Sequence, residues 1–105
     1  MRFVETPVFT AAIKGLLADE EYRALQLALL LRPEQGAVIP GSGGLRKLRW
    51  AGRGHGKRGG LRVIYVWYVT EEAFYMLFAY AKGAQADLTT DQVKSLRRLV
   101  KEELE

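Results

Sequence analysis

Basic residues without neighbouring acids are the feature of this sequence best suited to chemistry. Between Gln35 and Thr70 the chain has seven Lys and Arg residues and no Asp or Glu, so this window carries a charge of +7. The remainder has nine basic and twelve acidic residues and a charge of −3. Because the positive charge is concentrated in one part of the chain, we expect a polyanionic partner. Nucleic acid fits best, since Lys and Arg neutralise phosphates and release counterions.

Two cations of this window are predicted to share one face of a strand, and a third is predicted to enter the next strand. Residues 45–50 alternate in polarity, which indicates a strand with Lys47 and Arg49 on one face, and Arg62 enters the next predicted strand. A solvated strand face would explain these charges about as well if the sheet is covered on one side only. The five glycines of residues 51–60 favour phosphate binding, because small residues let backbone N–H groups approach an anion. Further residues expected to contact the nucleic acid are Arg46, Arg53, His55, Lys57 and Arg58.

The composition argues against several other classes of protein. A chain of 105 residues is expected to form a single domain spanning residues 1–105. It has no cysteine and one histidine, so we expect no disulfide and no catalytic metal. No stretch approaches the roughly 18 apolar residues of a membrane-spanning helix. We therefore expect a soluble cytoplasmic protein without a membrane partner or a cofactor.

Hydrophobic periodicity and turn signals predict an α+β fold. Helix starts are expected at Thr6-Pro7 and at Asp19, where Asp19 would cap the second helix, and Pro33 would end it. A turn-rich linker follows, and Thr89 with Gln92 forms a capping box for a final amphipathic helix. The predicted architecture is a small antiparallel sheet, mixed at its edge, of about four strands, with an N-terminal helical hairpin packed on it and a C-terminal helix. The predicted strands cover residues 2–5, 45–50, 61–69 and 73–81.

An ordered block in the middle of the chain resembles the RelE-type toxins of bacterial toxin–antitoxin pairs. It consists of residues 43–50, the Gly/Lys/Arg loop through Gly60, residues 61–65, and Tyr80-Ala81-Lys82. The resemblance is closest to the HigB-like branch and covers nearly the whole chain. It implies an mRNA interferase, a metal-independent endoribonuclease that usually enters the ribosomal A site and cuts the message being translated. It also implies a neutralising helix-turn-helix antitoxin, whose acidic and apolar residues would cover the basic surface or the helix beside it.

By position, the functional basic residues of that family correspond to Lys47, Arg49 and Arg62 and, more loosely, to Lys82. Cleaving RNA through its 2′-hydroxyl requires removal of a proton, stabilisation of charge on the phosphorus, and a proton for the departing 5′-oxygen. We assign Arg62 and Arg49 to the scissile phosphate, and Lys47 and Lys82 to the electrostatic field or proton transfer. Tyr80 is the preferred tyrosine, because it lies two residues before Lys82 on the same strand face.

The general acid and base remain open at this stage. RelE has further basic residues and a tyrosine in its C-terminal segment, whereas residues 83–87 here read Gly-Ala-Gln-Ala-Asp. His55 has an unperturbed pKa near neutrality, yet a histidine in a glycine-rich loop is more often solvated or in contact with phosphate. Two other functions are compatible with the sequence: a nucleic-acid-binding domain that does not cut, and a ParE-like toxin that acts on DNA gyrase.

Overall fold

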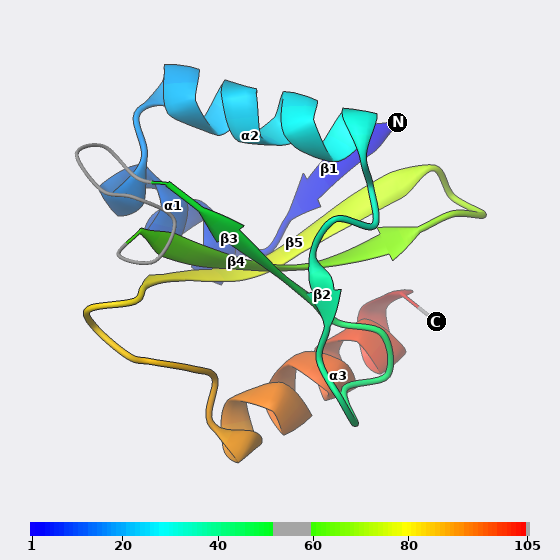
Figure 1. The fold of residues 1–105 in the computed structure, drawn as a ribbon. Helices are drawn as coiled ribbons and strands as arrows, with labels where there is room; N and C mark the ends of the chain where they lie inside the picture. The colour runs from blue at the N-terminus through cyan, green and yellow to red at the C-terminus, as the bar shows by residue number, and fades with distance from the viewer. Residues whose placement is uncertain (52–59, 105) are drawn as a thin grey trace.

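A five-stranded mixed sheet forms the centre of the protein and has helices on both of its faces (Figure 1). The computed structural model describes residues 1–51 and 60–104. The strand order is β1-β5-β4-β3-β2, with β1 parallel to β5 and all other neighbours antiparallel. The strands are β1 (Arg2–Glu5), β2 (Ala37–Val38), β3 (Arg46–Trp50), β4 (Leu61–Tyr68) and β5 (Ala73–Ala81).

The predicted α+β class is confirmed, but the sheet has five strands rather than about four. The additional strand is β2, in which Ala37 and Val38 pair with Lys47 and Arg46 of β3. Two residues are too few for an alternating pattern to stand out within a turn-rich segment. This strand forms because the edge of β3 supplies hydrogen-bond partners. The local sequence does not show that these partners are available.

In the described part of the chain three helices pack on the sheet, two on one face and one on the other (Figure 1). The N-terminal pair is the predicted helical hairpin, and the last helix follows a long connection from β5. Among the described residues, the C-terminal helix is the one helix on its face of the sheet. The helices are α1 (Pro7–Leu16), α2 (Asp19–Leu31) and α3 (Thr90–Leu104).

Side-chain caps fix where the helices of the hairpin begin. Thr6 accepts a hydrogen bond from the Phe9 N–H at 3.0 Å, as the sequence predicts for the start of α1. The prediction that Asp19 caps α2 is wrong, because Ala18 holds the cap position and Asp19 is the first helical residue. Glu21 supplies the missing interaction, since its carboxylate accepts a hydrogen bond from the Ala18 N–H at 3.0 Å.

Each face of the sheet carries its own apolar core. On the α1 and α2 side, helix residues such as Phe9 and Leu25 pack on Tyr65 and Phe74 of the sheet. On the α3 side, Val100 and its neighbours pack on other residues of β4 and β5. Because alternate residues of a strand face opposite sides, the central strands β4 and β5 must be apolar on both faces. The buried residues of the α3 side are Leu45, Ile64, Val66, Ala73, Tyr75, Leu77, Tyr80 and Val100.

A β-bulge in β5 changes which side chains reach the α3 side. Ile64 pairs with Phe78, whereas its neighbour Tyr65 pairs with Met76, so that Leu77 is an extra residue in β5. Leu77 and Phe78 consequently both pack on the α3 side. Without the bulge, strict alternation from Leu77 would turn Tyr80 toward the helical hairpin. The bulge therefore places Tyr80 on the same face as Arg62.

Candidate nucleic-acid site on the α3 side of the sheet

One row of residues crosses three strands on the α3 side and contains most of the predicted catalytic groups. Arg49 of β3 pairs with Arg62 of β4, and Arg62 pairs in turn with Tyr80 of β5. Lys47 lies two residues before Arg49, on the same face and opposite Ile64. The structure thus brings together four residues from three strands, two of them arginines paired across neighbouring strands.

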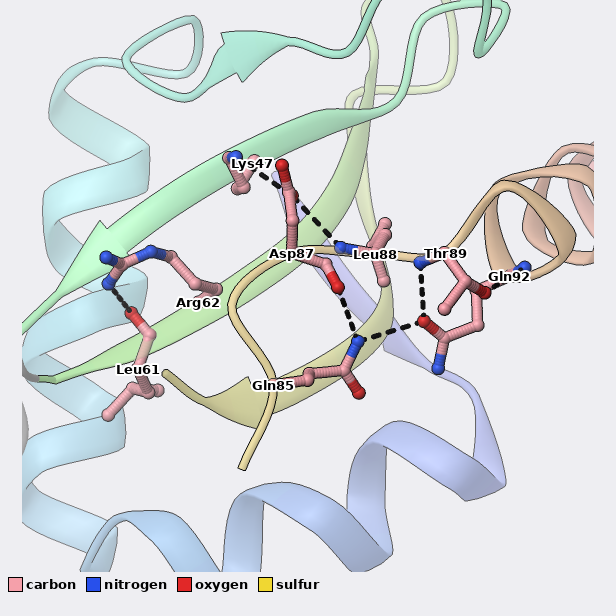
Figure 2. A network of polar contacts seen from close by, with 8 residues as sticks. All are labelled: Lys47, Leu61, Arg62, Gln85, Asp87, Leu88, Thr89 and Gln92. Atoms are coloured by element: carbon pink, nitrogen blue, oxygen red, sulfur yellow. Dashed lines mark hydrogen bonds and ion pairs between the residues drawn. The ribbon is translucent and has the colours of Figure 1, made fainter. Parts of the chain in front are cut away.

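Arg62 is buried, with 3% of its surface exposed, and it lies at the centre of this row. Its Nη1 donates a hydrogen bond to the Leu61 carbonyl oxygen at 3.2 Å (Figure 2). A guanidinium keeps its charge when buried, so the interior of the site stays cationic at any physiological pH. A buried permanent cation next to a second arginine provides a strong field for an anionic ligand.

Asp87 places a carboxylate next to Lys47, at the edge of this row of residues. Its Oδ1 lies 3.1 Å from the Nζ of Lys47 and accepts a hydrogen bond from the Leu88 N–H at 3.0 Å (Figure 2). The hydrogen bond from Lys47 is the main cause that lowers the pKa of Asp87, and the Leu88 N–H and the charge of Arg62 act in the same direction. The Asp87 side chain is 67% exposed, whereas that of Lys47 is 22% exposed. A solvent-accessible carboxylate therefore holds one of the cations of the site.

The segment that carries Asp87 is tied to the start of α3. Gln85 donates from its Nε2 to the Asp87 carbonyl oxygen at 2.8 Å and to the Gln92 Oε1 at 2.9 Å (Figure 2). Gln92 also completes the predicted capping box, since Thr89 N–H donates to its Oε1 at 2.9 Å and its own N–H donates to Thr89 Oγ1 at 3.0 Å. The cap of α3 thus positions Asp87 against Lys47.

Tyr80 has a hydroxyl suited to donating a proton. The Oη atom is buried and has no hydrogen-bond partner within the described part of the chain. Burial is the main cause that raises the pKa of Tyr80, and the charge of Asp87 raises it further, while Arg62 opposes the shift. Tyr80 is consequently a neutral phenol at physiological pH, with a proton that no described acceptor holds.

The remaining predicted site residues lie elsewhere. Lys82 is exposed just beyond the end of β5, where its N–H bonds to the Gly60 carbonyl oxygen at 3.1 Å. Arg46 faces the opposite side of the sheet from Lys47, and its Nη1 bonds to the carbonyl oxygens of Glu34 at 2.9 Å and Gly36 at 2.8 Å. This holds the linker before β2 in place. Arg53, His55, Lys57 and Arg58, which were expected to contact nucleic acid, lie outside the described residues.

Asp87 was missed by the sequence reasoning, which treated residues 83–87 only as a departure from the RelE pattern. Lys47 and Asp87 are forty residues apart, and no local spacing links them. The one local signal was the capping box that begins at Thr89, because it fixes the residues just before it next to the helix start. That signal gives the place of Asp87 along the chain but not its partner in the sheet.

The fold and the site define a small α+β protein with a row of cationic residues on one face of its sheet. A family model described as RelE toxin of the RelE / RelB toxin–antitoxin system matches residues 30–105, which is more than half of the chain and includes every site residue above. The chain therefore belongs to the RelE toxin family, and membership implies an antitoxin partner. Within residues 1–51 and 60–104 there is no cluster of His, Cys, Asp and Glu that could hold a metal ion, and no helix long and apolar enough to cross a membrane.

Proposed function

We propose that this protein is a HigB-like mRNA interferase, an endoribonuclease that cuts messages on the translating ribosome in the cytoplasm. The observation that carries the proposal is the row formed by Arg49, Arg62 and Tyr80 across three strands. Two permanent cations and a neutral phenol supply two of the three requirements of cleavage through a 2′-hydroxyl. The proposed partners are mRNA, the ribosome and a helix-turn-helix antitoxin.

In this proposal Arg62 and Arg49 bind the scissile phosphate. The 2′-oxygen attacks the phosphorus, and the additional negative charge that develops on the phosphate oxygens is stabilised by the two guanidinium groups. Strand pairing fixes the backbones of these two residues next to each other before RNA arrives, which brings both arginines to the same place on the sheet. Lys47 adds to the positive field next to them.

Tyr80 is proposed to donate the proton that the departing 5′-oxygen needs. Its raised pKa keeps the phenol protonated, and its hydroxyl is next to the cation that would hold the phosphate. Lys82, exposed beyond the end of the same strand, is proposed to assist by its charge. No described residue is assigned as the base that removes the proton from the 2′-hydroxyl.

Purified ribosomes programmed with a defined message provide the test. We expect the wild-type protein to produce cuts that leave a 2′,3′-cyclic phosphate and a 5′-hydroxyl, the products of attack by the 2′-oxygen. Arg62→Ala should lower the rate about a hundredfold or more, as removal of one preorganised charge stabiliser does in other enzymes. Because Arg62 is buried, Arg49→Ala, at an exposed residue of the same row, is the second variant.

Lys14→Ala is the matched control, because Lys14 is an exposed cation of α1 on the opposite side of the sheet. It should cut as fast as the wild type. Equal cutting by wild type, Arg62→Ala and Arg49→Ala would contradict the proposed site. Binding of ribosomes without any cutting by the wild type would favour the non-cutting nucleic-acid binder.

A further inference from the structure

A second basic surface lies on α3, outside the site described above. The four residues that form it follow the spacing i, i+3, i+4, i+7, which places them on one side of a helix. All four are exposed, whereas Leu96, Leu99 and Val100 of the same helix pack on the sheet. We call this surface the α3 stripe, and it consists of Lys94, Arg97, Arg98 and Lys101.

The α3 stripe is self-repelling. Every member has another member three or four residues away, and like charges at these separations destabilise a helix. Asp91 and Glu102 are on the same helix, yet neither of these carboxylates forms an ion pair with a stripe residue. An ordinary solvated helix would intersperse acids among these positions. Concentrated positive charge of this kind is favourable when a polyanion lies against it.

The α3 stripe starts close to the candidate site. Asp87 is bound to Lys47, and α3 begins three residues later at Thr90, as the course of the chain from β5 to α3 shows (Figure 1). Between α3 and the turn before β3 there is a hollow of about 280 Å³, whose lining includes Leu88, Lys94 and Arg97. This hollow connects the residue next to Asp87 with the first cations of the stripe.

Arg97 is held at the wall of this hollow. Its Nη1 donates to the Gly41 carbonyl oxygen at 3.4 Å. Gly43, at φ +76°, lies so close that an added Cβ would come within 3.2 Å of the Arg97 Nε. The turn of residues 41–44 thus leaves room for the Arg97 side chain and holds one cation of the stripe at the hollow.

We propose that the α3 stripe binds the sugar-phosphate backbone of RNA away from the scissile phosphate. This inference rests on the proposed function, because it extends the track of the same RNA. From residue 94 to 101 the stripe covers about 10 Å along the helix, enough for more than one phosphate of a strand. Binding through the backbone positions RNA without reading its sequence.

The character of the stripe favours RNA over a protein partner. Protein interfaces are centred on aromatic and apolar side chains and are depleted in Lys. Ser95 is the exposed residue between the stripe positions, and the other exposed α3 residues whose side chains are described are Thr90, Asp91 and Glu102, none of which is apolar. The stripe therefore lacks the apolar centre that an antitoxin helix would need, and it retains the charge that phosphates need.

The test is the salt dependence of binding to a fluorescent single-stranded RNA whose 2′-hydroxyls are methylated, so that it cannot be cut. The variant is Arg98→Ala with Lys101→Ala, which removes two charges and keeps helix-favouring residues. The control is Lys14→Ala with Arg23→Ala, which removes two exposed charges from α1 and α2. The slope of log K against log salt should fall in magnitude by about 1.4 in the stripe variant, about 0.7 for each lost phosphate contact, and stay unchanged in the control.

The outcomes separate this inference from the proposed function. If the wild type binds RNA and the stripe variant and the control have the same slope of log K against log salt, the role of the α3 stripe is overturned. The proposed function would be left intact. A stripe variant that binds RNA like the wild type but no longer binds the antitoxin would also overturn the role of the α3 stripe. Absence of RNA and ribosome binding by the wild type would contradict the proposed function, and the inference with it.

Discussion

The carboxylate of Asp87 lies against Lys47 and within the field of Arg62. Under the proposed function, an RNA phosphate would compete with this carboxylate for the same position. Asp87→Asn removes this negative charge and releases Lys47, so RNA should bind more tightly. One additional phosphate contact would steepen the salt dependence of binding to single-stranded RNA by about 0.7. Titration of non-cleavable RNA at several salt concentrations measures this effect. Asp91→Asn, the same change at an exposed position of α3, is the control, and equal affinity of both variants would contradict the competition.

The same carboxylate gives the stability of the protein a defined pH dependence. The pKa of Asp87 is lowered in the folded state from its ordinary value of 3.8, so the folded protein favours the ionised form. Its contribution to the free energy of unfolding is therefore complete above about pH 4 and disappears as the pH falls through the folded-state pKa. The effect is small, because Asp87 is exposed and its ion pair is screened by solvent and salt. Urea unfolding should show wild type more stable than Asp87→Asn at neutral pH and the difference shrinking as the pH falls below about 4; a difference independent of pH would contradict the assignment.

Tyr80 has a hydroxyl whose loss should affect catalysis and not folding. The hydroxyl is buried with no partner in the described ranges, so Tyr80→Phe removes an unsatisfied polar group and should leave stability equal or slightly higher. If Tyr80 donates the proton to the leaving oxygen, cleavage should slow by about a hundredfold or more while RNA affinity is kept. These effects are separated by measuring single-turnover cleavage, RNA affinity and urea unfolding on the same preparation of Tyr80→Phe. Full cleavage by Tyr80→Phe would remove Tyr80 from the mechanism.

At the scale of elements, the linker between α2 and β3 is held by close contact with β4. Tyr65 of β4 donates from its hydroxyl to the Pro33 carbonyl oxygen at 2.7 Å and accepts from the Gly36 N–H at 3.0 Å. A Cβ at Gly36 would lie 2.7 Å from the Tyr65 ring, with the Lys47 carbonyl oxygen at 3.2 Å. Both neighbours are fixed, so a methyl group at Gly36 cannot be accommodated without moving the ring or the strand.

Gly36→Ala should therefore lower the free energy of unfolding by about 1–3 kcal/mol, the usual cost of overpacking. Gly15→Ala is the control, because nothing lies within 4 Å of an added Cβ at that position of α1. That variant should gain about 0.5–1 kcal/mol, since alanine loses less backbone entropy than glycine in a helix. Urea unfolding of both variants measures the difference, and equal stability would show that the linker is not tightly packed.

The elements also show how far the sequence predicts this fold. Period-2 patterns and capping residues were enough for four strands and three helices, because these signals are local. The bulge at Leu77 and the strand β2 were not predictable, since both depend on pairing with strands distant in the sequence. The positions of the candidate site residues follow the same rule: alternation placed Lys47 and Arg49 on one strand face, but the pairing of Arg49 with Arg62 and the contact of Asp87 with Lys47 required the folded sheet.

At the scale of the whole molecule, the cations of the site and of the α3 stripe lie on the α3 side of the sheet. Arg49, Arg62 and Lys47 belong to the sheet, and the stripe belongs to the helix that covers part of it. The helical hairpin on the other side carries acids at the start of α2. An RNA would therefore be attracted to one side of the molecule and oriented before any specific contact forms.

The most direct measurement is growth of bacteria after tightly controlled expression, together with mapping of the 5′ ends of cellular mRNA. Expression of the wild-type protein should arrest growth and produce new ends inside translated frames, whereas Arg62→Ala and Arg49→Ala should do neither, and Lys14→Ala should behave like the wild type. Growth arrest with uncut messages would contradict the account and favour action on gyrase. Normal growth with intact messages under wild-type expression would contradict ribonuclease activity altogether.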